Sequence, residues 1–328
     1  MIISKTPYRI SFFGGGTDFP NWYNRFGGQV ISTSINKYSY LVIRSLPEIF
    51  KYKFRIRYYY REEKNSKENI RHPVVRELLK INKDIKNIDI THHGDLPARS
   101  GIGSSSAFTV GLIHSLSILK KKNISKKDLA NSAIFFEQNI LKESVGSQDQ
   151  VATSHGGFNS INFSNKGFNV KRCNNLNFIK KLESWCQIFY LGNQRSASSL
   201  EKKKFEYINK FKEKILLEMM QITNEAKNIL LSKNKNNFID FVKLLDDQWT
   251  LKKYLDKSIS SNIIDQLYLH GKKHGAISGK ILGAGGGGFF LFLTPPKFQK
   301  SLEEKIKLPK IKVKFEDKGS QIIMNSDD

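Results

Sequence analysis

Cysteine is scarce in this chain, which has only Cys173 and Cys186 among its 328 residues. Two isolated cysteines exclude a disulfide framework and a clustered thiolate metal site. No apolar run reaches the roughly 18–20 residues that a membrane-crossing helix needs. The first residues lead into an alternating segment and lack the long apolar stretch of a signal peptide. We therefore expect a cytoplasmic protein that does not associate with membranes.

Acidic residues are also few, with 30 Asp and Glu against 54 Lys and Arg, giving a formal net charge of +24. Such a charge attracts phosphates and is compatible with RNA binding. Lysine recurs throughout, however, as in residues 120–122 and 202–204, and no basic stripe interleaved with aromatic residues accompanies an RNA-binding motif. We interpret the charge as compositional drift and expect no nucleic-acid partner. A basic field would also attract ATP and phosphorylated substrates.

The chain begins with a strand pattern. Tyr8, Ile10 and Phe12 alternate with their neighbours, which is typical of a half-buried strand, and Gly14-Gly15-Gly16 ends it. No repeat or linker marks a domain boundary, which we place near residues 170–180. Further elements are predicted as follows: a β-rich stretch over 30–60, a charged loop over 61–72, a strand over 88–90, a helix from Ala107, a helix opened by the capping box of Ser125 and Asp128, a strand over 159–163, amphipathic helices over 200–232 and 237–256, and an apolar strand over 289–293.

Residues 97–107 carry the strongest functional signal, because a strand, a Gly/Ser-rich loop and a helix follow one another there. Backbone N–H groups of such a loop and of the first helical turn converge on one spot, which makes an anion site. Glycine lets the backbone approach phosphate oxygens, and serine hydroxyls bind phosphate or Mg²⁺. An ordinary helix cap would need one serine, whereas three follow Gly103. The segment therefore predicts phosphate binding, although it lacks the Gly-Lys-Ser/Thr ending of a P-loop.

A second glycine cluster near the C-terminus satisfies the spacing of a dinucleotide fingerprint with Gly283, Gly285 and Gly288. That fingerprint opens a helix inside a βαβ unit. Here the glycines lead directly into the apolar segment 289–293, which reads as a strand. We therefore reject a dinucleotide site and expect a tight loop that lines a ligand.

Two acidic residues suit phosphoryl transfer, which needs metal-bridged phosphates and a group that orients the attacking hydroxyl. Glu137 lies beside the apolar stripe of a predicted helix, and Asp149 lies on a polar turn between two glutamines. On spacing alone, a solvated helix residue and a turn former explain these positions better.

Three motifs in order change this balance: residues 6–19 (TPYRISFFGGGTDF), residues 101–107 (GIGSSSA) and residues 283–288 (GAGGGG). Together they make the chain resemble the GHMP kinases, the superfamily of galactokinase, homoserine kinase, mevalonate kinase and phosphomevalonate kinase. The resemblance implies an ATP-dependent kinase with Mg²⁺ and an α+β, two-lobed fold. Residues 1–172 would form an N-terminal lobe like the second domain of ribosomal protein S5. Residues 173–328 would form a ferredoxin-like C-terminal lobe with added helices.

The same resemblance assigns roles to single residues. Asp149 would accept or orient the proton of the acceptor hydroxyl, and Arg9 would stabilise the transition state beside it. Ser105, or its neighbour Ser104, would ligate Mg²⁺ together with Glu137. The ATP phosphates would lie against Pro97, Gly101, Gly103, Ser104, Ser105 and Ser106, and the second lobe would line the substrate cleft with Gly285, Gly286 and Gly287.

The first motif narrows the choice of candidate substrates. Asp18, after Thr17, matches an aspartate that hydrogen-bonds sugar hydroxyls in galactokinase-like members. Gly15 and Gly16 replace the Glu-His of those members, which leaves space for a larger sugar.

Together with residues 146–150 (GSQDQ) and 192–196 (GNQRS), this motif most resembles the D-glycero-D-manno-heptose 7-phosphate kinases. The resemblance implies transfer to the anomeric hydroxyl, giving a 1,7-bisphosphate for the nucleotide-activated heptose of a surface polysaccharide. Arg99 and Arg195 are candidates to hold the phosphate that this substrate already carries. A different sugar acceptor, as in galactokinase or fucokinase, and a non-catalytic sugar-binding paralogue remain alternatives, and a homodimer is compatible with the sequence.

Overall fold

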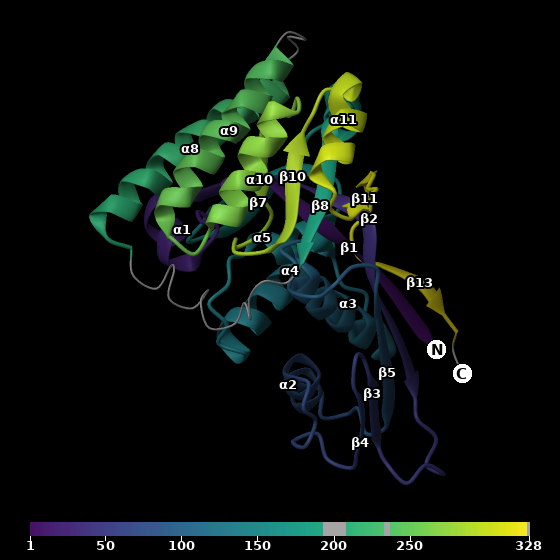
Figure 1. Cartoon of the computed structure of the whole chain (residues 1–328). Coiled ribbons are helices and arrows are strands. Elements are labelled where there is room, and N and C mark those ends of the chain that lie inside the picture. The colour runs from purple at the N-terminus through teal and green to yellow at the C-terminus, as the bar shows by residue number, and fades with distance from the viewer. Residues whose placement is uncertain (193–207, 233–236, 327–328) are drawn as a thin grey trace.

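Two long antiparallel strands, β1 (Ile2–Phe13) and β2 (Gly28–Ser45), organise the first half of the chain. The computed structural model describes residues 1–192, 208–232 and 237–326 (Figure 1). The first sheet has the order β13-β1-β2-β5-β3-β4, while β6 and β12 pair with β2, and β7 pairs with β6. The added strands are β3 (Phe54–Arg57), β4 (Arg61–Lys64), β5 (Ile88–Gly94), β6 (Phe158–Ser164), β7 (Gly167–Arg172), β12 (Phe315–Glu316) and β13 (Gln321–Asn325).

β1 lies in the middle of the molecule and is buried on both faces from Thr6 to Phe13. The prediction of a half-buried strand was therefore wrong. One face packs on helix α3 (Ser104–Leu119), and the other meets the helices of the second lobe, where Phe13 packs edge-on against Phe241 with ring centroids 5.0 Å apart. Because both faces are covered, the polar residues of this strand are held inside the protein.

The second sheet has the order β11-β8-β10-β9, with all pairs antiparallel. Its strands are β8 (Cys186–Gly192), β9 (Ser278–Ile281), β10 (Gly288–Leu293) and β11 (Lys310–Ile311). Every residue of β10 is buried, which confirms the apolar strand predicted over 289–293. Helices α8 (Lys210–Leu231), α9 (Phe238–Leu255) and α10 (Asn262–Lys273) lie together on one side of this sheet (Figure 1).

Several expected elements differ at their ends. The amphipathic helices expected over 200–232 and 237–256 are α8 and α9 within the described residues, and residues 200–207 lie outside these. The charged loop expected over 61–72 was wrong at its start, because β4 pairs there with β3. The remaining helices are α1 (Pro20–Phe26), α2 (Pro73–Ile81), α4 (Lys126–Phe135), the π-helix η1 (Phe136–Ile140), α5 (Gln148–His155), α6 (Leu176–Trp185) and α11 (Pro296–Ile306).

The end of the described chain returns to its beginning. β13 runs antiparallel to β1, and the amino group of Met1 donates to the carbonyl oxygen of Ser326 at 2.6 Å (Figure 1). Two strands from the last part of the chain, β12 and β13, therefore join the sheet of the first lobe. The division into residues 1–172 and 173–328 stays a prediction, with the addition that the second range contributes to both sheets.

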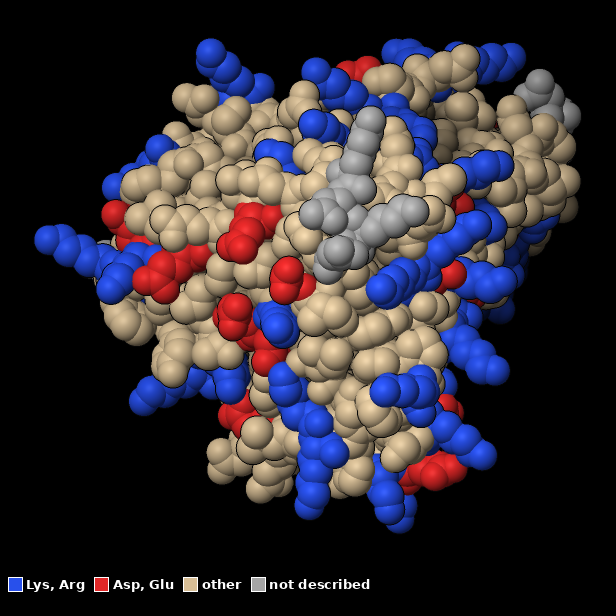
Figure 2. Space-filling view, turned by 90° about the horizontal axis from the view of Figure 1, so that it is seen from above, with Lys and Arg blue, Asp and Glu red and all other residues tan. Residues whose placement is uncertain are grey.

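Lys and Arg side chains cover much of the face seen in Figure 2, and most of the Asp and Glu side chains on it lie in its left half. Within the described ranges, no helix combines the length and apolarity that spanning a membrane requires.

Candidate active site

The loop between β5 and α3 turns through two glycines in the left-handed region, with φ of 86° at Gly101 and 73° at Gly103. A Cβ atom on Gly101 would lie 2.3 Å from the carbonyl oxygen of Leu282, so close packing also requires glycine. Helix α3 begins at Ser104, three residues before the predicted start at Ala107. All three serines therefore lie in the first turn, where backbone N–H groups have no partner within the helix.

The two glycine loops meet between the lobes. A Cβ atom on Gly283 would lie 2.4 Å from the Cα atom of Gly101, and the N–H of Phe289 donates to Ser100 O at 3.2 Å. The second loop leads into strand β10, which agrees with rejection of a dinucleotide fingerprint. Gly286 donates its N–H to Ile259 O at 3.0 Å, so part of this loop packs on its own lobe.

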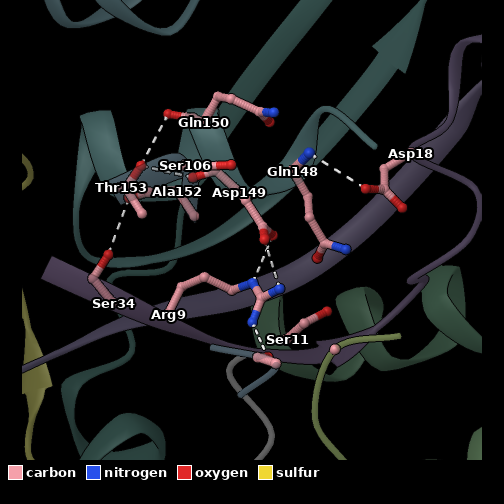
Figure 3. A network of polar contacts seen from close by, with 12 residues as sticks. Arg9, Ser11, Asp18, Ser34, Ser106, Gln148, Asp149, Gln150, Ala152 and Thr153 are labelled. Atoms are coloured by element: carbon pink, nitrogen blue, oxygen red, sulfur yellow. Dashed lines mark hydrogen bonds and ion pairs between the residues drawn. The ribbon is translucent and has the colours of Figure 1, made fainter. Parts of the chain in front are cut away.

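A bidentate ion pair joins β1 to the start of α5 beside the first loop. Arg9 donates from Nε to Asp149 Oδ1 at 2.7 Å and from Nη2 to Oδ2 at 2.8 Å (Figure 3). Its Nη1 donates to Gly101 O at 2.6 Å. The Arg9 side chain is 4% exposed and that of Asp149 is 24% exposed. A Cβ atom on Gly103 would lie 3.4 Å from Asp149 Oδ2, so this carboxylate lies directly against the loop. The expected turn at Asp149 is the first turn of α5.

Glu137 is buried in the π-helix η1 and contacts a serine of the loop. Ser106 Oγ donates to Glu137 Oε2 at 3.0 Å, and Gln150 Nε2 donates to the same oxygen. Glu137 Oε1 has no partner among the described residues. Burial raises the pKa of this carboxyl to about 7. The serine in contact is therefore Ser106, whereas the resemblance pointed to Ser105, which is exposed, or Ser104.

The polar side chains of the turn after β1 form hydrogen bonds to other groups of the protein. Thr17 Oγ1 donates to Gly14 O at 2.8 Å. Asp18 accepts from the N–H of Gly16 at 2.9 Å and from the N–H of Gln148 at 3.3 Å, and it is 1% exposed. Burial raises the pKa of the Asp18 carboxyl, and the negative charge of Asp149 adds to this. Asp18 thus connects this turn to α5, and sugar binding by Thr17 and Asp18 stays a prediction.

The remaining predicted residues lie at the edge of the site or outside it. Pro97 O accepts from Ser100 Oγ at 2.6 Å. Arg99 is exposed, has a φ of 59° and donates its backbone N–H to Ser104 Oγ at 3.1 Å. Arg195 lies outside the described residues. A phosphate-binding role of Arg99 and Arg195 stays a prediction.

Sequence reasoning missed two buried lysines of the second lobe. Lys252 on α9 donates to Gly283 O at 2.7 Å. Lys280 on β9 donates to Ser11 O at 3.0 Å and to Phe12 O at 2.8 Å. Burial lowers the pKa of Lys280 well below its usual value, and the charges of Lys252 and Arg9 contribute. No local pattern marks these two among 54 basic residues.

The arrangement suits phosphoryl transfer. A partly exposed carboxylate can orient a hydroxyl, and a fixed guanidinium beside it can stabilise charge that develops on a transferred phosphoryl group. The adjacent loop offers the free N–H groups of a helix N-terminus to phosphate oxygens.

The chain agrees with known kinases in sequence and in fold. Residues 69–157 match the family described as GHMP kinases N terminal domain. Over its whole length the chain superposes with a TM-score of 0.79 and 21% identity on all of the D-glycero-D-manno-heptose 1-phosphate kinase structure from Bacteroides thetaiotaomicron. Residues 69–157 are thus similar to the GHMP kinase N-terminal domain, and the chain shares the fold of such kinases. Its relatives make it a phosphotransferase that acts on an alcohol group.

Two curated relatives show how the chain compares within this class. It is 27% identical over 306 residues to D-glycero-alpha-D-manno-heptose 7-phosphate kinase of Campylobacter jejuni, covering 90% of each chain. It is 28% identical over 229 residues to the mevalonate kinase of Thermococcus onnurineus, covering 68% of this chain and 64% of that protein. Of these two relatives, the heptose 7-phosphate kinase matches the larger share of this chain.

Proposed function

We propose that this protein phosphorylates the anomeric hydroxyl of D-glycero-D-manno-heptose 7-phosphate with ATP and Mg²⁺, giving the 1,7-bisphosphate. The observation that carries the proposal is the Arg9–Asp149 pair against the Gly101–Ser106 loop. The heptose acceptor is supported by the Campylobacter jejuni relative and by Gly15 and Gly16 in the first motif.

The residues around Glu137 fit a divalent cation. Its Oε1 is buried without a partner, and the buried carboxyl lacks an opposing charge among its hydrogen-bond partners, Ser106 and Gln150. No group of three or more His, Cys, Asp and Glu gathers within the described ranges. Mg²⁺ in kinases is typically bound through one or two protein ligands and the substrate phosphates, so a single carboxylate with a serine suffices. Bound there, Mg²⁺ would neutralise charge on the ATP phosphates.

The chain's own residues then act by position and charge. The loop N–H groups hold the ATP phosphates, and Asp149 accepts a hydrogen bond from the acceptor hydroxyl and receives its proton as the phosphoryl group transfers. Arg9 keeps the Asp149 carboxylate oriented and places a positive charge beside the transferring group. Phosphoryl transfer needs little covalent help from a protein, so this positioning accounts for most of the expected rate gain.

The test is ATP consumption by the purified protein against a panel of heptose 7-phosphate, free heptose, galactose, fucose and mevalonate. We expect the highest kcat/KM with heptose 7-phosphate and none without an acceptor. A higher kcat/KM with galactose or fucose would favour the alternative of another sugar kinase. ATP binding without turnover of any acceptor would favour the non-catalytic paralogue.

A further inference from the structure

The space above Gly15 is surrounded by polar atoms from both lobes. A Cβ atom built there would meet Gln148 Nε2 at 3.7 Å, Lys252 Nζ at 3.8 Å and Ser11 Oγ at 3.8 Å. Gly15 is buried and its φ lies outside the positive range that favours glycine. A Cβ atom would make only ordinary van der Waals contacts there, so neither the backbone conformation nor close packing requires glycine at this position.

One side-chain atom that faces this space, Ser11 Oγ, is buried and has no hydrogen-bond partner among the described residues, and Ser11 as a whole is only 4% exposed. Figure 3 shows Ser11 and Gln148 beside the Arg9–Asp149 pair. Buried polar atoms are nearly always hydrogen-bonded, so an unsatisfied hydroxyl next to the Arg9–Asp149 pair points to a polar ligand.

Positive charge is concentrated at the same place. Lys252 is 7% exposed, Lys280 is 2% exposed and Arg9 is 3% exposed. Arg9 is neutralised by Asp149, while Lys280 donates to two backbone carbonyl oxygens. Burial lowers the pKa of Lys280, the charges of Lys252 and Arg9 lower it further, and an anion bound among these groups would favour their charged forms. Cations gathered inside a protein mark a site for a negatively charged ligand.

We propose that this pocket, formed by Ser11, Gly15, Gln148, Lys252 and Lys280, binds the phosphate group that the sugar acceptor already carries. The inference rests on the proposed function and specifies its substrate class as a phosphorylated sugar. Lys252 contacts the phosphate, Ser11 and the amide nitrogen of Gln148 donate hydrogen bonds to it, and Lys280 shapes the floor of the pocket.

This pocket is a better candidate than Arg99 for binding the phosphate group of the sugar acceptor. Arg99 is exposed and belongs to the loop proposed to hold the ATP phosphates. Lys252 on α9 instead lies beside Gly15. Gly15 belongs to the turn after β1, at the position where galactokinase-like members carry a glutamate. A carboxylate at that position would lie close to the lysine and repel a phosphate, whereas glycine adds no charge there.

The first test replaces Lys252 by methionine, which keeps the length of the side chain and removes its charge. Loss of one charged hydrogen bond to phosphate should raise KM for heptose 7-phosphate about 10- to 100-fold. The ratio of kcat/KM for heptose 7-phosphate over free heptose should fall by a similar factor. Lys243→Met, an exposed position on the same helix, is the matched control and should keep the wild-type ratio.

The second test needs no change at a lysine. Gly15→Glu and Gly15→Gln have nearly equal volume and differ in charge. We expect the glutamate variant to have at least a tenfold lower kcat/KM for heptose 7-phosphate than the glutamine variant, with ATP binding retained in both. This pair remains informative if Lys252→Met fails to fold.

The outcomes separate this inference from the proposed function. If the wild type uses heptose 7-phosphate but Lys252→Met and Gly15→Glu leave its KM within twofold of their controls, the phosphate pocket is wrong and the kinase assignment stands. If the wild type uses free heptose as well as heptose 7-phosphate, the phosphate is not recognised and the inference is overturned. If no phosphorylated sugar is turned over, the proposed acceptor fails, and the pocket fails with it.

Discussion

Replacing Asp149 by asparagine should remove turnover and reduce stability for separate reasons. Arg9 is almost fully buried, and its guanidinium donates two short hydrogen bonds to the Asp149 carboxylate, at 2.7 and 2.8 Å. Removing one partner of a fully buried pair costs about 3–5 kcal/mol. Because the Asp149 side chain is 24% exposed, water can partly replace the hydrogen bonds that Arg9 loses in this variant. We therefore expect the free energy of unfolding to fall by about 2–3 kcal/mol.

Turnover should fall more steeply than stability. Loss of a general base typically lowers kcat by about 10²- to 10⁴-fold, while the loop that we propose as the ATP-phosphate site is unchanged. The assay combines urea denaturation, a fluorescent-nucleotide titration and ATP consumption with heptose 7-phosphate. Asp317→Asn is the matched control, because Arg172 and Asp317 form a similar ion pair at 2.7 Å with side chains 44% and 83% exposed. This control should lose less than about 1 kcal/mol and keep its activity.

A double variant separates the two effects. Arg9→Gln combined with Asp149→Asn leaves no unpaired charge, so it should recover most of the stability that Asp149→Asn loses and none of the turnover. Normal turnover by Asp149→Asn would refute the role of this carboxylate as proton acceptor. A loss of stability no larger than that of Asp317→Asn would refute the argument from burial.

Three further predictions concern the metal, the loop and pH. Burial raises the pKa of Glu137 to about 7. Without metal, the charge of this carboxylate therefore destabilises the fold increasingly as pH rises from about 4.5 to 7. Glu137→Gln should accordingly melt at a higher temperature than the wild type at pH 8. The same variant should lose the extra thermal stabilisation that MgCl₂ adds to ATP, and retention of that gain would contradict the metal site. Gly101→Ala places a Cβ atom 2.3 Å from Leu282 O at a φ of 86°. The affinity for ATP should therefore fall at least about tenfold in a nucleotide titration. An unchanged Kd would contradict the assignment of this loop as the ATP-phosphate site. Burial lowers the pKa of His72 and His92 to about 4, so the unfolded chain takes up protons first and the free energy of unfolding should decrease as pH falls from about 6.5 to 4. Urea denaturation at pH 7.5, 6 and 5 tests this, and a constant midpoint would contradict it.

Local patterns in the sequence were sufficient for the elements that depend on neighbouring residues. The capping box is one case, since Ser125 Oγ accepts from the N–H of Asp128 at 3.1 Å. The glycine loops are another, because a left-handed turn before a helix or strand is a property of a few consecutive residues. Strand β4 escaped prediction because its charged sequence forms a strand only when β3 lies beside it.

By itself, then, the sequence determined the kinase class, the glycine turn before α3 and the identity of the Arg9 and Asp149 pair through short motifs. Only the tertiary structure decided that Ser106 contacts Glu137, that Asp18 accepts from the N–H of Gln148, and that Lys252 and Lys280 lie near the end of β1. The physical reason is distance along the chain. These contacts join residues 31 to 269 positions apart, and which of many similar side chains becomes buried depends on how the lobes pack around β1.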